Sequence, residues 1–258
     1  MISEHIDGLL CDLDGVVYRG DEPIAGAPEA VVRLRKLGVR IVFCTNNSRS
    51  TVAQYVEKLA RVGVEATADD ILTSGLVTAD VLKARGFSGR RAIVVGGEGV
   101  SDALLAAGIS IDDDPSSITA DLVVVGWDPE FDYATMRRAA AAVRGGATFV
   151  ATNSDATFPA PDGLWPGAGA ILASIETAAG RPAEVMGKPY PPTMDAATRR
   201  LAGATHIAAI GDRPAPERDV ATAGAVTAAA LLGAHVVRVH AVKEMVDAVR
   251  VADMLRTQ

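Results

Sequence analysis

The sequence predicts an α/β fold in which a doubly wound parallel sheet is covered by helices on both faces. Three observations support this. Short β-branched runs alternate with longer, Ala-rich helical stretches, which is typical of strand–helix–strand units. Acidic and amide residues directly follow several predicted strands, at the edge where such sheets bind ligands. The length of 258 residues allows a core domain with a second, smaller α/β domain inserted.

The predicted elements follow one another in a regular order. The first strands are predicted over residues 8–13 and 39–44, and the first helices over 27–37, 51–62 and 76–85. A second series of strands is predicted over 91–96, 122–126 and 148–152, with later strands over 207–211 and 236–239. Residues 112–117 read as a polar turn, and the Ala-rich stretch 139–143 reads as helix.

Composition excludes several classes of protein. The chain carries 25 Lys and Arg against 32 Asp and Glu, and its basic residues are scattered, which argues against nucleic acid or a membrane as partner. No run approaches the ~20 apolar residues of a membrane span. Cys11 and Cys44 lie in apolar runs, which favours small apolar packing in a reducing compartment, with redox sensing as the alternative. We expect a cytoplasmic protein, because the N-terminus has no signal-peptide pattern.

The first motif that carries chemistry is Asp12-Leu13-Asp14-Gly15, which ends the first strand. Two carboxylates after an apolar run are costly unless their charge is compensated, and a hard cation does this well. One carboxylate can attack phosphorus and form an aspartyl-phosphate, while its neighbour protonates the leaving oxygen. The alternative is an ordinary Asp-Gly turn that closes the strand.

The second motif, Thr45-Asn46, follows the next strand. A hydroxyl and an amide there could hold phosphoryl oxygens without adding charge. The alternative is a helix cap, for which Asn47, Ser48 and Ser50 are the candidates.

Two further motifs lie late in the chain. Lys188 precedes a proline, which favours an extended backbone at Lys188 and would direct its long side chain toward a fixed point. The alternative is a solvated surface lysine. Asp212 follows a strand and a glycine, so it could be a metal ligand, and Glu217 comes shortly after it.

In this order the four motifs resemble the haloacid dehalogenase superfamily. The resemblance implies a HAD-like Rossmannoid core with Asp12 as nucleophile and Asp14 as general acid and base. It further implies a phosphate site of Gly15, Thr45, Asn46 and Lys188, and Mg²⁺ held by Asp12, the backbone carbonyl of Asp14 and Asp212, with Glu217 in the second shell of ligands. The acid at Asp14 points to phosphate rather than carbon–halogen chemistry.

Other segments look like the NagD-like branch, which includes 4-nitrophenylphosphatase and phosphoglycolate, glycerol-3-phosphate and pyridoxal-phosphate phosphatases. These segments are residues 14–18, 123–128, 152–155 and 167–170. Only one loop and one helix fit between Asp12 and Thr45, whereas an insert of about 100 residues fits between Thr45 and Lys188. We therefore expect a catalytic core of residues 1–78 and 180–258 and an α/β cap of residues 79–179.

The resemblance implies an Mg²⁺-dependent phosphatase that hydrolyses small phosphate monoesters of a phosphorylated metabolite, with a homodimer through the cap as one option. Two alternatives stay open, a phosphomutase and a catalytically weak phosphate-ester-binding protein on the same fold. Product analysis separates the first from a phosphatase, because a mutase returns an isomer instead of inorganic phosphate.

Three further features carry alternatives. Residues 96–99 read as a turn of the cap or as a phosphate-binding loop, and Trp127 and Trp165 either border the substrate or pack in a core. The segment after residue 213 resembles the C-terminal end of dihydropteroate synthase, where Arg238 and His240 stand at the ligand-binding positions. That segment is too short to supply a barrel, so we expect it to complete the sheet of the core.

Overall fold

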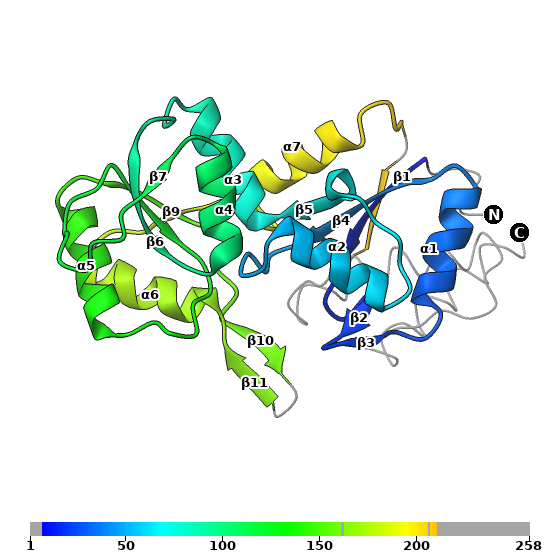
Figure 1. The fold of residues 1–258 in the computed structure, drawn as a ribbon, viewed down its shortest axis with the longest axis horizontal. Coiled ribbons are helices and arrows are strands. Elements are labelled where there is room, and N and C mark those ends of the chain that lie inside the picture. Colours follow the sequence, from blue (N-terminus) through cyan, green and yellow to red (C-terminus); the bar gives the residue numbers. More distant parts are fainter. Residues whose placement is uncertain (1–6, 161–162, 206, 211–258) are drawn as a thin grey trace, which may run out of the picture.

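The computed structural model describes residues 7–160, 163–205 and 207–210, and it confirms the predicted α/β class with parallel sheets. Figure 1 shows two sheets side by side, each with helices packed against it. Asp212, Glu217, the predicted strand over 236–239 and the segment with Arg238 and His240 lie outside the described residues.

The first sheet has the strand order β13–β1–β4–β5, and all of its strands are parallel. Its strands are β1 (Gly8–Asp12), β4 (Arg40–Thr45), β5 (Ile71–Thr73) and β13 (Ile207–Ile210). In the register of β1 and β4, Asp12 lies opposite Cys44. Because the strands are parallel, their carboxyl ends meet at one edge, and this brings residues 12–14 close to residues 45–46.

Helices cover both faces of this sheet. On one face, Leu9 and Cys11 pack with side chains of α1 (Ala27–Lys36) and α2 (Val52–Arg61). On the other, Leu10 packs with side chains of α3 (Ser74–Ala84) and α7 (Pro191–Arg200). Successive strand residues thus enter opposite cores, as the alternation of a strand requires.

The helix α2 begins with a capping box. Thr51 is its N-cap: its Oγ1 accepts from the backbone N–H of Gln54, and the Gln54 side chain accepts from the Thr51 N–H. The alternative assignment of this cap to Asn47, Ser48 or Ser50 is therefore wrong. Those residues form the loop that connects β4 to α2, and they do not cap the helix.

The second sheet has the order β12–β9–β8–β6–β7 and is also parallel. Its strands are β6 (Arg91–Val95), β7 (Ser110–Ile111), β8 (Leu122–Val125), β9 (Thr148–Ala151) and β12 (Glu184–Val185). One face packs against α4 (Glu98–Ala106), and the other against α5 (Tyr133–Arg144) and α6 (Ala168–Ala179).

Several short elements were not predicted. They are the strands β5, β7 and β12, the hairpin β2 (Tyr18–Arg19) and β3 (Glu22–Pro23), the 3-10 helix η2 (Ala68–Asp70), and the hairpin β10 (Thr157–Ala160) and β11 (Gly163–Pro166). The β10–β11 hairpin projects from the second sheet at the bottom of Figure 1. Strands of two or three residues are too short for a hydrophobic period to reveal them, and each strand of the β10–β11 hairpin contains a proline, which argues against a strand.

A single hydrophobic cluster joins the two sheets. Leu72 of the first sheet and Val124 of the second both belong to it, and Leu82 of α3 and Leu104 of α4 lie between them. The predicted division into a core and a cap stays a prediction. Residue 78 lies inside α3, and β12 of the second sheet lies after residue 179.

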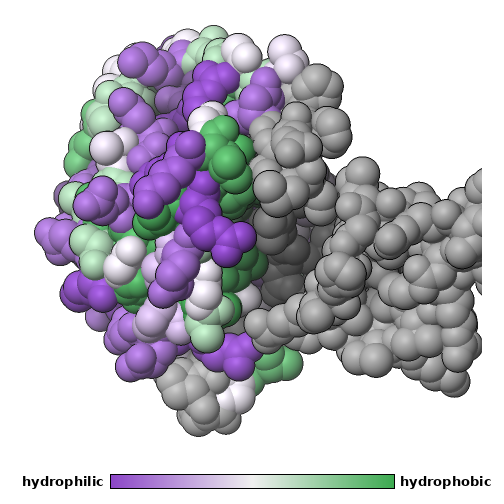
Figure 2. All heavy atoms as spheres, turned by 90° about the vertical axis from the view of Figure 1, so that its right-hand side faces the viewer, coloured by the Kyte–Doolittle hydropathy of each residue, from purple (hydrophilic) through white to green (hydrophobic). Residues whose placement is uncertain are grey.

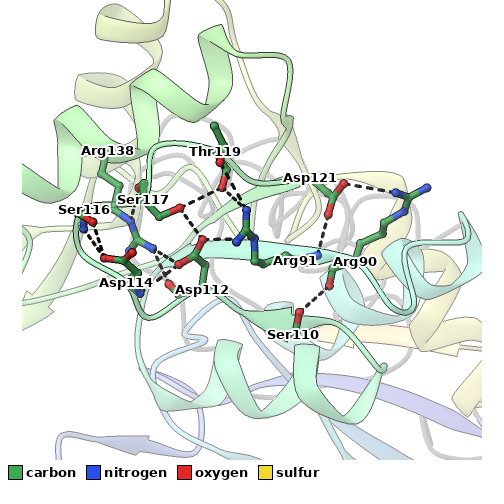
Figure 3. Close-up of polar contacts among 10 residues, drawn as sticks. All are labelled: Arg90, Arg91, Ser110, Asp112, Asp114, Ser116, Ser117, Thr119, Asp121 and Arg138. Carbon is green, nitrogen blue, oxygen red and sulfur yellow. Dashed lines mark hydrogen bonds and ion pairs between the residues drawn. The ribbon is translucent and has the colours of Figure 1, made fainter.

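A polar network closes the outer end of the second sheet (Figure 3). Asp112, whose side chain is 4% exposed, pairs with Arg138 at 3.1 Å and with Arg91 at 3.4 Å. Its carboxylate also accepts from the Ser117 hydroxyl at 2.7 Å and from the Asp114 N–H at 3.1 Å. The predicted polar turn over 112–117 is thus confirmed, and it is built around a buried carboxylate.

The surface at the end of the molecule that carries α1 is mixed. Figure 2 shows hydrophilic residues interspersed with small hydrophobic areas over the described part of this face. Single apolar residues are exposed here, such as Val32 of α1 and Leu37 directly after it, and isolated residues of this kind are normal on protein surfaces. Within the described ranges, none of the helices combines the length and the apolar character that crossing a membrane requires.

Candidate active site

Asp12 ends β1 and is buried, with 8% of its surface exposed. Its Oδ1 accepts a hydrogen bond from the Leu13 N–H at 2.9 Å and lies 2.8 Å from the Lys188 ammonium. The main-chain donor and the cation hold the same oxygen, which fixes the orientation of the carboxylate. A simple Asp-Gly turn would not need a lysine from a distant segment, so this geometry favours the functional interpretation.

Asp14 lies in the turn after β1, half-buried and bridged to Tyr18. Burial raises the pKa of the Asp14 carboxyl, and the charge of Asp12 adds to this rise. Lys58, Lys188 and a hydrogen bond with Thr45 act in the opposite direction but do not reverse it. Asp14 therefore keeps a proton to higher pH than an ordinary carboxyl group, as a general acid must.

Gly15 follows in the left-handed region with φ of +78°, which favours glycine there. Its N–H donates to the carbonyl of Tyr18 at 2.8 Å. The predicted role of Gly15 in binding phosphate stays a prediction.

Thr45 ends β4 beside Asp12 and is buried. Its Oγ1 accepts from the Asn47 N–H at 3.0 Å and is hydrogen-bonded with Asp14. The hydroxyl thus lies among the carboxylates, which agrees with the prediction that it belongs to the site.

Lys188 comes from the loop between β12 and α7 and reaches across to the first sheet. Its Nζ donates to the Cys44 carbonyl at 3.2 Å in addition to the contact with Asp12. Only 19% of its side chain is exposed, so it is not a solvated surface lysine. The structure brings Asp12, Asp14, Thr45 and Lys188 together.

The contacts of Asn46 differ from those of the other residues predicted to bind phosphate. Its Oδ1 accepts from the Lys188 N–H at 2.8 Å, and its Nδ2 donates to the Lys188 carbonyl at 3.0 Å. Its side chain therefore binds the backbone of the loop that carries the lysine. The predicted contact with phosphate stays a prediction.

A cleft of about 630 Å³ opens from Asp14 toward the second sheet. Its walls are mostly polar and carry both signs of charge, with Lys58 and Arg61 of α2 on one side and Asp128 and Glu130 on the other. Further lining residues are Tyr18, Asn47, Arg49, Ser50, Gln54, Tyr55, Glu57, Gly96, Gly97, Glu98 and Pro129. Such a cleft suits a ligand that forms hydrogen bonds over most of its surface.

The sequence patterns did not single out Tyr55 and Lys58, which both line this cleft. The Lys58 ammonium lies 4.0 Å from the centre of the Tyr18 ring, and the Tyr55 hydroxyl donates to the Asn47 carbonyl at 2.8 Å. Their spacing of three residues on one helix places them on one face, and this was the available signal.

Gly96 and Gly97 connect β6 to α4, whose first residues are Glu98 and Gly99, so the prediction of a turn is confirmed for the first two of the four residues. The Gly99 N–H donates to the Arg49 carbonyl at 2.8 Å. The Arg49 guanidinium lies 5.1 Å from the centre of the Trp127 ring, whose N–H donates to the Pro166 carbonyl. Trp165 is 45% exposed at the hairpin, so it is not a core residue.

Cys11 and Cys44 pack in different cores, one on each face of the first sheet. Burial raises the pKa of the Cys11 thiol to about 12 and that of the Cys44 thiol to about 11. Apolar packing explains both residues, because thiolates are the reactive form and these thiols stay protonated.

The carboxylates at the end of β1 are oxygen donors of the kind that hard divalent cations prefer. Asp12 offers such a carboxylate and Asp14 is predicted to offer its backbone carbonyl, while the third predicted ligand, Asp212, lies outside the described residues together with Glu217. Within residues 7–160, 163–205 and 207–210, His, Cys, Asp and Glu side chains form no group of three or more that could hold a metal.

Comparison with known proteins gives a consistent result. A family model described as haloacid dehalogenase-like hydrolase matches residues 9–110. The acid sugar phosphatase of Staphylococcus epidermidis is 35% identical over 210 residues, which are 81% of this chain and 80% of that protein.

Solved structures agree with this match. A glycerol phosphate phosphatase from Mycobacterium tuberculosis in complex with calcium aligns with a TM-score of 0.74 at 33% identity, over 82% of this chain and 62% of that chain. The same enzyme is known in complex with magnesium. A thermostable p-nitrophenylphosphatase from Bacillus stearothermophilus aligns with a TM-score of 0.70 at 34% identity, over 81% of this chain and 80% of that chain.

Proposed function

This chain belongs to the NagD-like phosphatases of the haloacid dehalogenase superfamily, and we propose that it hydrolyses small phosphate monoesters through an aspartyl-phosphate on Asp12. The family membership predicted from the four motifs is thereby confirmed. The observation that carries the proposal is the arrangement of Asp12, Asp14 and Lys188, with the Lys188 ammonium 2.8 Å from the Asp12 carboxylate.

The reaction has two halves. A carboxylate oxygen of Asp12 attacks phosphorus while the bond to the leaving oxygen breaks, and Asp14 gives that oxygen its proton, so an alcohol leaves. Asp14, now ionised, takes a proton from water, whose oxygen attacks the same phosphorus. The bond between phosphorus and Asp12 breaks, which releases inorganic phosphate and restores both residues.

The surrounding groups support these roles. The raised pKa of Asp14 keeps a proton available for the first half-reaction. Lys188 and the Thr45 hydroxyl lie where the phosphoryl oxygens would come, and a cation and a donor at this position stabilise the charge that develops there.

We further propose that the cation is Mg²⁺, held by the Asp12 carboxylate and the Asp14 backbone carbonyl together with Asp212. The donor set fits such an ion, because the buried carboxylate of Asp12 and a backbone carbonyl are hard oxygen donors at one strand end. When bound, Mg²⁺ would neutralise charge on the phosphoryl oxygens.

The substrate we propose is a small phosphorylated sugar or polyol. The names of the relatives, acid sugar phosphatase and glycerol phosphate phosphatase, suggest this class. The cleft supports it, because its walls offer charged and hydroxyl groups that can pair with the hydroxyls of a polyol.

The test is hydrolysis of 4-nitrophenyl phosphate and a panel of sugar phosphates with Mg²⁺ present, by the wild-type chain and by Asp12→Asn. We expect the variant to be inactive and folded by circular dichroism, because an amide cannot attack phosphorus. Asp69→Asn, at an exposed position of η2, is the matched control and keeps its activity. Near-normal turnover by a folded Asp12→Asn would remove the covalent mechanism, and a sugar-phosphate isomer as the product would show a mutase.

A further inference from the structure

Asn46 uses its whole side-chain amide on protein groups. Besides its two bonds to the Lys188 backbone, at 2.8 and 3.0 Å, its Nδ2 donates to Asp155 Oδ2 at 3.0 Å. One planar amide thus satisfies both the N–H and the carbonyl of Lys188, as a neighbouring strand would. This arrangement fixes the Lys188 backbone at the point from which its side chain reaches Asp12.

The backbone of Asn46 is held as well. Its carbonyl accepts from the Ser74 hydroxyl at 2.7 Å and from the Asn153 amide at 2.8 Å. Asn153 is 4% exposed and comes from the end of the second sheet. Asn46 is therefore anchored by both sheets before it binds the lysine loop.

The lysine loop approaches closely only because residue 187 is glycine. A Cβ at Gly187 would lie 2.7 Å from the Asn46 Oδ1 and 2.3 Å from the Thr152 carbonyl. No side chain fits in this space, since contacts below 3.0 Å force the backbone to move. Glycine at position 187 thus allows the lysine loop to approach both the Thr152 backbone and the Asn46 side chain.

Asp155 connects this contact to the base of the β10–β11 hairpin. Its carbonyl accepts from the Gly169 N–H at 2.9 Å at the start of α6, and its N–H donates to the Asn153 Oδ1 at 3.1 Å. The segment 152–155, which the proposed mechanism does not use, therefore has a structural connection to the site through Asn46.

We infer that Asn46 is a positioning residue, which fixes the Lys188 backbone against the segment 152–155 instead of binding phosphate with its side chain. The inference rests on the proposed function, in which Lys188 holds the transferred phosphoryl group. A lysine side chain carries about 2 kcal/mol of rotamer entropy, so the position of its backbone determines how well it is aimed.

A double-mutant cycle tests the inference. Asn46→Ala is expected to lower kcat/KM by about 10- to 100-fold, the usual effect of losing a residue that orients a ligand-binding side chain. In a Lys188→Met background the same change should cost less than about threefold, because the residue it orients is gone. Equal losses in both backgrounds would overturn the inference and show a direct phosphate contact.

Asp155 provides the second arm. Asp155→Ala removes one acceptor of Asn46 and should lower kcat/KM by about two- to tenfold, whereas Asp155→Asn keeps an acceptor oxygen and should restore activity. Ser154→Ala, at the exposed neighbouring position, is the matched control and leaves activity unchanged. Loss in Asp155→Ala without recovery in Asp155→Asn would contradict the proposed connection through the amide.

Binding of inorganic phosphate, measured by calorimetry with Mg²⁺ present, repeats the cycle without turnover. Non-additive affinities for Asn46→Ala and Lys188→Met support the inference even if no phosphate ester is hydrolysed. Additive affinities overturn it even if the wild-type chain is an active phosphatase. A failure of the proposed function can thus be distinguished from a failure of this inference. Unfolding temperatures identify any variant that has lost its fold.

Discussion

The Lys188 ammonium lies 2.8 Å from Oδ1 of Asp12, so the predicted nucleophile is paired with the residue predicted to hold its substrate's phosphate. Asp12 ends β1 and Lys188 follows β12, and the two meet at the carboxyl edge of the first sheet. With 10% and 19% of their side chains exposed, they are screened little by solvent. This pair and its neighbour Asp14 lead to two predictions, and contacts elsewhere in the structure lead to two more.

Lys188→Met should lower kcat/KM for 4-nitrophenyl phosphate by about 100- to 1,000-fold, the range seen when a donor to developing charge is removed. Methionine keeps the length and apolar stem of the side chain but removes the cation. Lys83→Met, at an exposed position of α3, is the control. Activity within about threefold of the wild type would exclude Lys188 from the site.

Asp14→Asn should harm alkyl phosphates much more than 4-nitrophenyl phosphate, because 4-nitrophenolate leaves without a proton and an alkoxide does not. The pKa of Asp14 is raised, so the acid form persists above the ordinary carboxyl range and is lost as pH rises through that higher pKa. The corresponding fall in kcat for an alkyl phosphate should disappear in the variant. An unchanged pH–rate profile would assign the acid role to another residue.

Gly99→Ala should destabilise the protein by about 1–3 kcal/mol, as overpacking does. A Cβ there would lie 2.1 Å from the Ser50 carbonyl oxygen and 2.7 Å from that of Ser48, so the loop after β4 would have to move. Gly145→Ala is the matched control, with its nearest contact at 3.3 Å and an ordinary helical backbone. Urea unfolding measures both, and equal stabilities would show that the loop yields without cost.

Asp112→Ala should lower the free energy of unfolding by about 3 kcal/mol, because it leaves the Arg138 guanidinium without its buried partner. The Ser117 hydroxyl, the Asp114 N–H and the two arginines hold the pKa of Asp112 below its usual value. Its stabilisation is therefore present above the ordinary carboxyl pKa and is lost as pH falls through the lower folded value.

Thermal unfolding of Asp112→Ala and the wild-type chain should consequently differ most near neutral pH and converge in acid. Arg90, on the exposed rim of the same network, pairs with Asp121 at 3.5 Å and is 61% exposed. Arg90→Ala is the control and should have little effect, since exposed ion pairs contribute little. A pH-independent difference between Asp112→Ala and the wild type would show that packing, not charge, is lost.

The sequence predicted the strand–helix order and, because parallel strands bring their carboxyl ends to one edge, the meeting of Asp12, Asp14 and Thr45. It was the family resemblance that predicted Lys188 beside them. The sequence did not predict that Asn46 binds the Lys188 backbone. A planar amide that pairs with a distant main chain leaves no periodic signal, and the type of residue fits a phosphate contact equally well. The sequence also did not predict that residues 48–50 pack against Gly97 and Gly99. A glycine can indicate that another group approaches the backbone closely, but it does not indicate which group.

Asn46 and Lys188 are separated by 142 positions in the chain, and this separation affects when, during synthesis and folding, the candidate active site is assembled. Domains emerge from the ribosome with their N-terminal parts first, so β1 and β4 exist long before residue 188 is synthesised. Contacts between such distant positions form late, because the entropy of closing the loop must be overcome first. We expect a nascent or truncated chain that ends before Lys188 to expose the paired carboxylates of Asp12 and Asp14 without their ammonium partner. Competence then arrives with closure of the long loop, and not with the earlier pairing of β1 and β4.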